Sequence, residues 1–404
     1  MERMKIAVAT GGHIPSLRAH SIAVMKMADG FRKLGHDVEI LTVERFLEVS
    51  LKRKIKDLHD FYGISHNVRI IYFKDSVFYL EEVFPFNYFF RFLDKITTKR
   101  IRDIADPEKR ISEYCKSRRF DLCYYRGYGR AAYYNVVNNK IPTIMESHVR
   151  NIMTPDLKRV IKISRLEYFK GLVTISEKLK RNFIRAGVPE EKILVLHSGV
   201  DLERFRSLPS IEDSRRILNL PLDRKLVVYV GSLFPEKGIK DILLVAEQIP
   251  QALFILVGGE PKYVKHWRKY AISRGIRNVK FTGFVNNSLV PLYLSAADAL
   301  IMPYGRECAR IMDIESTSPL KLFEYMAAKK PIISTKIPAI QRIIHHGVEG
   351  LLAEPENIEQ LTEYVRIALE DLKLAKKLGE QAHEKVKAYE WSERCRKILE
   401  KFCS

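Results

Sequence analysis

The chain alternates short apolar runs with longer stretches in which apolar residues recur every three or four positions. Residues 4–10 predict a strand, residues 19–34 a helix that ends at Gly35, and residues 37–43 a second strand. Further strands are expected at residues 68–73, 122–125, 143–146, 171–175 and 193–196, and then at 226–230, 252–257, 279–282, 299–302 and 332–334. Strands that alternate with helices in this way are typical of a parallel α/β architecture.

This pattern predicts two doubly wound domains, each with its own sheet. Residues 200–221 lack an apolar core pattern, and we expect them to form the linker. The N-terminal domain is then residues 1–200 and the C-terminal domain residues 201–385, with a terminal helix over residues 386–404. No apolar run approaches the roughly 20 residues that cross a bilayer, and the first strand is too short for a signal peptide. We therefore expect a cytoplasmic protein.

Composition narrows the chemistry. Of the 404 residues, 46% are hydrophobic and 29% charged, which is ordinary for a globular protein and excludes a wholly disordered chain. The five cysteines (Cys115, Cys123, Cys308, Cys395 and Cys403) form no Cys-x-x-Cys pair, so we expect buried or idle thiols rather than a zinc site or a disulfide framework. No Asp-x-Asp motif or cluster with metal-ligand spacing indicates a catalytic divalent ion, so no metal site is expected.

Positive charge is concentrated in the first half of the chain. The net charge is +20, and residues 1–200 hold 37 Lys and Arg against 23 Asp and Glu, compared with 32 against 26 in the remainder. This asymmetry fits nucleic acid, an anionic lipid surface or a polyanionic substrate, but a solubility preference spread over solvated helices would also produce it. Because no nucleic-acid-binding module is recognisable, we expect no nucleic-acid partner.

Residues 83–93 contain six aromatic side chains and are followed by Lys95, Lys99, Arg100 and Arg102. Aromatic rings beside cations suit an interfacial membrane contact or an apolar acceptor groove. A core helix with a solvated flank is the alternative interpretation of such a run.

Four predicted strands end in glycine-containing loops. These are Gly11 with Gly12, Gly231 with Ser232, Gly258 with Gly259, and Gly283. Ligands bind at the carboxyl ends of strands in open α/β sheets, where glycine lets them reach backbone N–H groups. No G-x-G-x-x-G is present, so a nicotinamide dinucleotide fingerprint is absent. Lys237 precedes a predicted helix at Ile239 and could reach a phosphate at a strand end, although an exposed lysine is the simpler interpretation.

Residues 318–327 predict a helix start at which an anion could bind. Ser318 is a favourable N-cap and Pro319 a favourable first helical residue, and the free N–H groups beyond them, from Leu320 on, favour a diphosphate. Lys321 lies in the first turn, where a cation is disfavoured unless an anion is near. A local Lys321–Glu324 pair, worth about 0.2–0.5 kcal/mol, is the alternative. Glu324 could instead accept hydrogen bonds from ribose hydroxyls.

Glu146, Ser147 and His148 follow another predicted strand of the N-terminal domain. A histidine at a strand end can donate to substrate hydroxyls or take part in proton transfer. A single histidine is more often structural, and the position at a strand end is what favours the functional interpretation.

Taken in order, these segments resemble retaining glycosyltransferases of the GT-B fold, family four. The resemblance rests on residues 11–12, 35–38, 173–177, 187–188, 192–193, 197–201, 230–232, 237–238, 257–259, 281–284 and 322–327. It covers nearly the whole chain and is weakest over residues 50–120. The resemblance implies two Rossmann-like domains facing a central cleft, an N-terminal domain for the acceptor and a C-terminal domain for a nucleotide sugar. It also implies that the terminal helix with Trp391 and Ser392 crosses back to the N-terminal domain.

The resemblance assigns roles to single positions. His148 would face the transferred sugar, Lys237 would neutralise the diphosphate and Glu324 would hold the ribose. The residues expected around the nucleotide sugar are Gly11, Gly12, Gly231, Ser232, Gly259, Phe284, Val285, Ser318, Pro319, Leu320 and Lys321. The donor is expected to carry UDP or GDP, with no further cofactor.

Two departures from the family pattern concern the donor. The family usually has arginine where this chain has Ser232, and often a glutamate eight positions before Glu324, where this chain has Ser316 beside Glu315. We expect Lys321 or Arg310 to replace the missing charge. Asparagine is also more usual than Ser198 before Gly199.

The resemblance implies transfer with retention at the anomeric carbon, in which the acceptor attacks from the leaving-group face and the departing phosphate takes its proton. Helix-end amides and cations would stabilise the leaving diphosphate. We expect a lipid-linked, polysaccharide or glycoconjugate acceptor and a peripheral position at the inner face of the cell membrane. The alternative is a catalytically degenerate relative that docks on a membrane or partner. An epimerase of similar architecture fits the ordered motifs less well, and the sequence leaves the base, sugar, acceptor and oligomeric state open.

Overall fold

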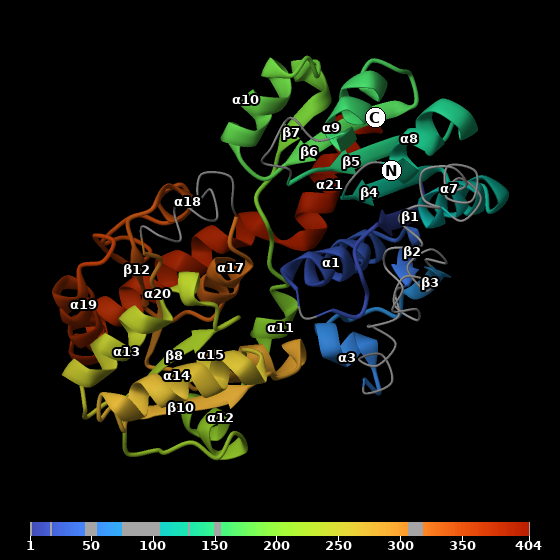
Figure 1. Ribbon diagram of the computed structural model, residues 1–404. Coiled ribbons are helices and arrows are strands. Elements are labelled where there is room, and N and C mark those ends of the chain that lie inside the picture. Colours follow the sequence, from blue (N-terminus) through green and yellow to red (C-terminus); the bar gives the residue numbers. More distant parts are fainter. Residues whose placement is uncertain are drawn as a thin grey trace, which may run out of the picture. The chain divides into compact units, whose positions relative to one another are not determined.

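The computed structural model describes residues 2–16, 18–44, 55–74, 106–127, 130–148, 155–305 and 318–403. The chain divides into two compact units, the first made of residues 1–197 with 391–404 and the second of residues 198–390. Each unit is built around one parallel sheet (Figure 1). The aromatic run at residues 83–93, with the cations that follow it, lies outside the described residues, as do Cys308, Arg310, Glu315 and Ser316.

The first unit has a seven-stranded sheet in the order β3-β2-β1-β4-β5-β6-β7. Its strands are β1 (Lys5–Thr10), β2 (Asp37–Glu44), β3 (Arg69–Lys74), β4 (Leu122–Arg126), β5 (Thr143–Glu146), β6 (Phe169–Thr174) and β7 (Ile193–Val195). All seven were predicted from the apolar runs to within two residues at each end. The strand order reverses between β1 and β4, the point at which doubly wound sheets bind ligands.

The helices of the first unit are α1 (Ala19–Lys33), α3 (Leu58–Tyr62), α7 (Pro107–Ser117), α8 (Arg130–Tyr134), α9 (Pro155–Ile163), α10 (Glu177–Arg185) and α21 (Trp391–Phe402). A short π-helical segment, Asn135–Asn139, follows α8. Helix α21 packs along α1 although more than 350 residues separate them in the chain (Figure 1). The fit is close, because a Cβ added at Gly30 would lie 2.9 Å from Cys395 Sγ.

The second unit has a six-stranded sheet in the order β10-β9-β8-β11-β12-β13. Its strands are β8 (Leu226–Val230), β9 (Leu253–Val257), β10 (Val279–Gly283), β11 (Ala299–Met302), β12 (Ile332–Thr335) and β13 (Leu351–Ala353). The sequence did not predict β13, which is a three-residue edge strand with no apolar alternation of its own. The order reverses between β8 and β11, so both units have the same topology around their switch points.

The helices of the second unit are α11 (Glu203–Arg206), α12 (Ile211–Ile217), α13 (Ile239–Gln248), α14 (Pro261–Ser273), α15 (Val290–Ser295), α17 (Leu320–Ala327), α18 (Pro338–Gln341), α19 (Ile358–Glu370) and α20 (Leu372–Val386). The expected linker over residues 200–221 is wrong. Val200, Phe205 and Leu220 are buried in the same apolar core as β8, so this segment is part of the second unit. Its apolar residues are too widely spaced to show a helical period.

Three of the cysteines, Cys115, Cys123 and Cys395, are buried thiols, and Cys403 is an exposed one. Among the described residues, no helix is both long and apolar enough to span a bilayer.

Candidate functional site

The glycine-containing loops of the second unit adjoin one another at the carboxyl ends of three neighbouring strands. Gly231 N–H donates to Val257 O at 2.9 Å, and Gly258 N–H donates to Gly283 O at 2.9 Å. A Cβ added at Gly258 would lie 2.4 Å from Gly231 O, and the φ of Gly258 is +109°. Glycine is therefore required here by a close backbone approach as well as by conformation. Next to it, a Cβ added at Gly259 would lie 2.5 Å from the Leu233 side chain.

A lysine ammonium lies directly against the Gly231 loop. Lys321, in the first turn of α17, places Nζ 2.7 Å from the position that a Cβ on Gly231 would occupy. The same Nζ donates to Tyr229 Oη at 2.7 Å, and the Tyr229 hydroxyl in turn donates to Ser232 O at 2.8 Å. Tyr229 therefore fixes both the cation and the loop that it faces.

The start of α17 differs in detail from the sequence prediction. Pro319, not Ser318, is the N-cap residue, Leu320 begins the helix, and no side chain caps it. The Ser318 hydroxyl is already used, because it accepts the Ser198 N–H at 2.9 Å. Ser198 Oγ donates to Ser318 O at 3.0 Å, so two segments 120 residues apart hold each other here.

Glu324, one turn into α17, forms an ion pair that the sequence did not indicate. Its Oε1 lies 3.5 Å from Arg204 Nη1, and both side chains are largely buried, at 17% and 10% exposure. Arg204 also donates to Asn287 O, on the segment after β10. The guanidinium thus holds the Glu324 carboxylate and ties α11 to that segment.

The other predicted donor residues of the second unit lie on the loops after β8 and β10. Lys237 ends a single 3-10 turn just before α13, and its Nζ lies 5.6 Å from the Tyr304 ring centroid. Phe284, directly after β10, is 46% exposed, while Val285 packs on the core beneath.

In the first unit, the predicted glycine loop is held by polar contacts at the end of β1. Gly12 N–H donates to Thr10 Oγ1 at 2.9 Å, and Thr42 Oγ1 donates to Gly12 O at 2.8 Å. His20 Nε2 lies 2.7 Å from Thr10 Oγ1, and a Cβ added at Gly12 would lie 2.6 Å from the His20 ring. A Cβ added at Gly11 would be 3.0 Å from a Glu108 carboxylate oxygen.

Register places three polar residues side by side at the switch point of this sheet. Thr10 of β1 is paired with Arg126 of β4, and Arg126 is paired with Glu146 of β5. The Glu146 carboxylate is 1% exposed and lies 3.1 Å from Arg126 Nη1 and 2.7 Å from His148 Nε2. His148 itself is 34% exposed, so it forms the solvent-facing end of a buried charged group.

Two further members of this group were missed from the sequence. Arg394 of α21 places Nη1 3.1 Å from Glu146 Oε2, and the Tyr124 hydroxyl donates to the same carboxylate. The buried stripe of α21 is Trp391, Arg394, Cys395, Ile398 and Leu399. A cation in the middle of an apolar helix stripe was the signal that could have revealed it.

The electrostatics keep the histidines of this group neutral. Burial, then Arg126 and His148, lower the pKa of His20 to about 3. Burial and Arg126 also lower the pKa of His148, against the opposing effect of Glu146. Burial alone would raise the pKa of Glu146, but Arg126 and Arg394 hold it well below its usual value. The carboxylate is therefore ionised beside uncharged imidazoles.

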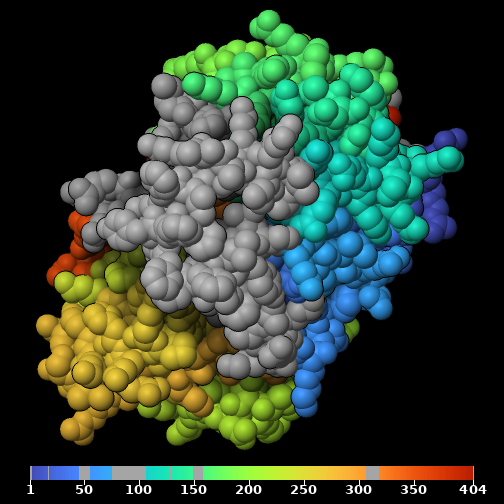
Figure 2. Space-filling model, turned by 45° about the vertical axis from the view of Figure 1, so that its right-hand side comes forward, coloured from blue at the N-terminus to red at the C-terminus, as the bar shows by residue number. Residues whose placement is uncertain are grey.

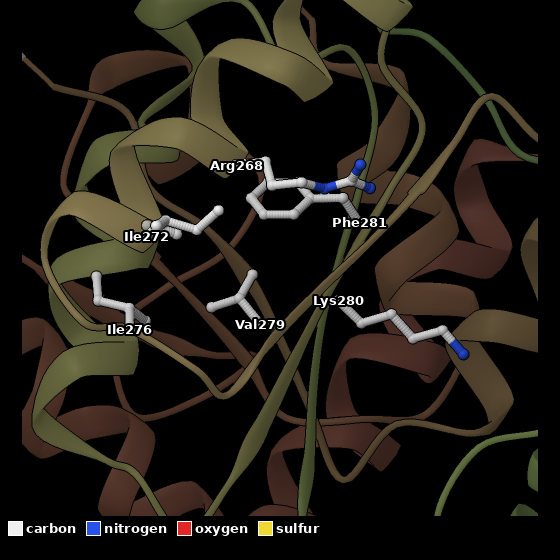
Figure 3. Close-up of a pocket in the computed structure, with 7 residues that line it drawn as sticks. Arg268, Ile272, Ile276, Val279, Lys280 and Phe281 are labelled. Atoms are coloured by element: carbon white, nitrogen blue, oxygen red, sulfur yellow. The ribbon is translucent and has the colours of Figure 1, made fainter.

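A shallow cavity of about 340 Å³ lies elsewhere, between α14 and the edge strand β10 (Figure 3). Ile272, Ile276 and Val279 line it together with Arg268, Lys280 and Phe281. Residues of this part of the second unit appear in gold in Figure 2. None of the predicted site residues lines this cavity. Within the described parts of the chain, no group of three or more His, Cys, Asp and Glu could hold a metal ion.

Two family models of glycosyltransferases match successive parts of the chain. "Glycosyltransferase Family 4" matches residues 21–204, and "Glycosyl transferases group 1" matches residues 210–385. The first match lies almost wholly in the first unit and the second match lies in the second unit, and each of these units holds one parallel Rossmann-like sheet.

Curated relatives match over part of their length. One is an uncharacterised glycosyltransferase of Methanocaldococcus jannaschii, 24% identical over 54% of this chain and 56% of that protein. Another is the GDP-mannose-dependent alpha-(1-6)-phosphatidylinositol monomannoside mannosyltransferase of Mycobacterium tuberculosis, 28% identical over 56% of this chain and 60% of that protein. The processive diacylglycerol alpha-glucosyltransferase of Acholeplasma laidlawii is 26% identical over 43% of this chain and 49% of that protein. The chain thus spans about half to three-fifths of the length of these relatives.

Solved structures match the whole chain. HepE of Anabaena in complex with UDP and glucose aligns with a TM-score of 0.71 and 18% identity, covering 98% of this chain and 99% of that one. Sucrose-phosphate synthase of Thermosynechococcus elongatus aligns with a TM-score of 0.70 and 18% identity, covering 98% of both chains. These likenesses show the GT-B fold.

Proposed function

We propose that this protein is a retaining glycosyltransferase that moves a sugar from a UDP- or GDP-sugar to a lipid-linked or polysaccharide acceptor without a metal ion. The observation that carries the proposal is the Lys321 ammonium seated against Gly231, beside the adjoining glycine loops. Both family models support it. Relatives named for GDP-mannose, phosphatidylinositol mannoside and diacylglycerol support the donor and acceptor classes, as does HepE with UDP and glucose.

In this proposal the second unit binds the nucleoside diphosphate. The backbone N–H of Ser232, together with Lys321 and Lys237, binds the diphosphate oxygens, while the Gly231 N–H is donated to Val257 O. Lys321 supplies the positive charge that Ser232 does not.

The remaining donor contacts come from α17 and the loops after β9 and β10. Arg204 holds the Glu324 carboxylate through Oε1, and Oε2 accepts hydrogen bonds from the ribose hydroxyls. The backbone at Phe284 and Val285 holds the base, and Gly259 leaves room beside it. The amides that begin α17, from Leu320 on, contribute their dipole to the leaving group.

The first unit contributes the sugar and acceptor contacts. Gly11 and Gly12 leave space for the donor sugar or diphosphate, and His148 contacts a hydroxyl of the transferred sugar. The acceptor attacks the anomeric carbon from the face that the diphosphate leaves, and the departing phosphate oxygen takes the acceptor's proton. The bond to the leaving oxygen breaks as the new glycosidic bond forms, so configuration is retained.

We place the protein peripherally at the inner face of the cell membrane. The excess of cations in residues 1–200 supports this position, since anionic lipid attracts basic surfaces. The protein should sediment with anionic liposomes at low salt and remain in the supernatant with neutral ones. Equal partition with both kinds of liposome would contradict the membrane position and leave the activity untouched.

Nucleotide-dependent stabilisation tests the donor site. Thermal unfolding is followed with UDP, GDP, ADP and CMP, each with and without EDTA. A hundredfold excess over Kd should stabilise by about 2.7 kcal/mol. We expect this stabilisation with one of the diphosphates, and we expect EDTA to leave it unchanged. The stabilisation by the nucleotide should be weaker in Lys321→Met, Lys237→Ala and Glu324→Gln.

Lys269→Ala is the matched control, because Lys269 is exposed on α14 of the same unit. Once the base is known, the matching nucleotide sugars are offered with glycolipid acceptors, and NMR of the product gives the anomeric configuration. Inversion would contradict the retaining mechanism. No stabilisation by any nucleotide would favour the catalytically degenerate docking protein instead.

A further inference from the structure

The buried charged group around Glu146 contains more charged side chains than the stability of the fold requires. Glu146, Arg126 and Arg394 have side-chain exposures of 1%, 7% and 4%. Arg394 also donates to His197 O at 2.9 Å. Removing three charges from water is costly, and apolar residues of similar volume often stabilise a core as well or better. Stability alone therefore does not account for two arginines on one carboxylate.

The group has one more cation than anion. Both guanidiniums contact the single Glu146 carboxylate, and Arg126 Nε and Arg394 Nη2 have no hydrogen-bond partner among the described residues. A further positive charge on His148 would face both arginines, with Glu146 and neutral His20 as the other titratable groups around it. The arrangement disfavours the imidazolium form of His148.

The contact between His148 and Glu146 also fixes which nitrogen carries the proton. An ionised carboxylate can only accept hydrogen bonds, so His148 Nε2, 2.7 Å from Glu146 Oε1, must be the donor. In a neutral imidazole the other nitrogen, Nδ1, is then an acceptor.

We propose that Arg394 is a positioning residue: with Arg126 it holds the Glu146 carboxylate that fixes His148 as the neutral Nε2–H form, leaving Nδ1 to accept a hydrogen bond. The partner of Nδ1 is a hydroxyl group, which must donate its proton to the ring. This assignment rests on the proposed function in taking that hydroxyl to belong to the transferred sugar. The C-terminal helix thereby acts on the site through one carboxylate.

NMR of the full chain labelled with ¹⁵N-histidine tests the proposal without using activity. Comparison with His148→Gln assigns the His148 ring. We expect its long-range ¹H–¹⁵N pattern to be that of the Nε2–H tautomer, with titration below pH 6.5. In Arg394→Met, loss of one cation should raise the His148 pKa. The acid limb of kcat/KM for transfer should move to higher pH by the same amount.

Arg396→Met is the control, because Arg396 is an exposed arginine on the same helix that pairs with Glu393 and Glu400. It should leave the His148 titration and the pH profile unchanged, and Arg394→Lys should restore most of the wild-type profile. If Arg394→Met does not fold, the wild-type tautomer and the Arg394→Lys titration decide the matter. An Nδ1–H tautomer, a charged ring at pH 7, or equal titrations in the two methionine variants would overturn the proposal.

The proposed function fails separately. A wild-type protein that shows the expected His148 tautomer but neither binds a nucleotide nor transfers a sugar would refute the glycosyltransferase assignment and leave the Arg394 network standing.

Discussion

Replacing Tyr325 by Phe should destabilise the second unit through a single unsatisfied backbone donor. Tyr325 of α17 is fully buried, and its hydroxyl accepts the N–H of Val230, the last residue of β8, at 2.7 Å. Phenylalanine keeps the ring and its packing but removes the acceptor. The Val230 N–H would then lie in apolar surroundings without a partner, at a cost of about 1–3 kcal/mol.

The size of the effect on melting follows from the size of the unit. For domains of 150–250 residues, 1 kcal/mol shifts Tm by about 2–4 °C, and the second unit spans residues 198–390. The expected loss is therefore roughly 2–12 °C. Urea unfolding should show a lower midpoint with an unchanged slope, since the surface exposed on unfolding stays the same.

Tyr364→Phe is the comparison. The Tyr364 hydroxyl accepts from Gln360 Nε2 at 3.1 Å, and both side chains are only half-buried, so water can replace the lost partner. We expect a change within about 0.5 kcal/mol. Equal destabilisation in the two variants would refute the argument that the buried N–H, rather than the hydroxyl itself, sets the cost.

Three further substitutions probe packing and burial. Gly30→Ala normally favours a helix, but here the new methyl would lie 2.9 Å from a side chain of α21, so calorimetry should show a net loss of about 1–3 kcal/mol. Gly12→Ala would place its methyl 2.6 Å from the His20 ring and should also lower Tm, whereas an unchanged Tm would mean that the ring moves freely. Burial and then Glu356 raise the pKa of Asp241 to about 6, so its contribution to stability is lost as pH rises from about 4 through 6. Asp241→Asn should therefore be more stable than wild type by about 1–3 kcal/mol at pH 8 and converge with it at pH 4, as urea titrations at both pH values would show.

Local patterns sufficed for most of the sheet framework. The strands are short and apolar, and those of the switch points are buried along their length. A run such as residues 226–230 can therefore be predicted as a strand from its own residues, without tertiary information. β13 and the core contacts of Val200 and Leu220 were missed because burial there comes from residues that are distant in the sequence.

The candidate donor-site residues divide in the same way, into those with a local sequence signal and those whose contacts join residues distant in the sequence. Gly231 and Lys321 were named from strand-end and helix-start patterns, and the structure brings them together through Tyr229. The N-cap role of Ser318 was wrong, because its hydroxyl binds a backbone N–H 120 residues away, which no local rule contains. Arg204 gave no signal at all, since its partner Glu324 lies on a different helix.

The return of α21 to the first unit has a consequence for the order in which the molecule acquires its structure. Chains usually fold domain by domain from the N-terminus as they are synthesised. Here residues 198–390 can complete their own unit while the first still lacks α21, including the arginine that neutralises Glu146. During that interval a buried carboxylate has one cation instead of two, and the α1 surface that α21 covers is bare. The unit that is started first is therefore finished last, and the α1 surface stays uncovered in the nascent chain until α21 emerges.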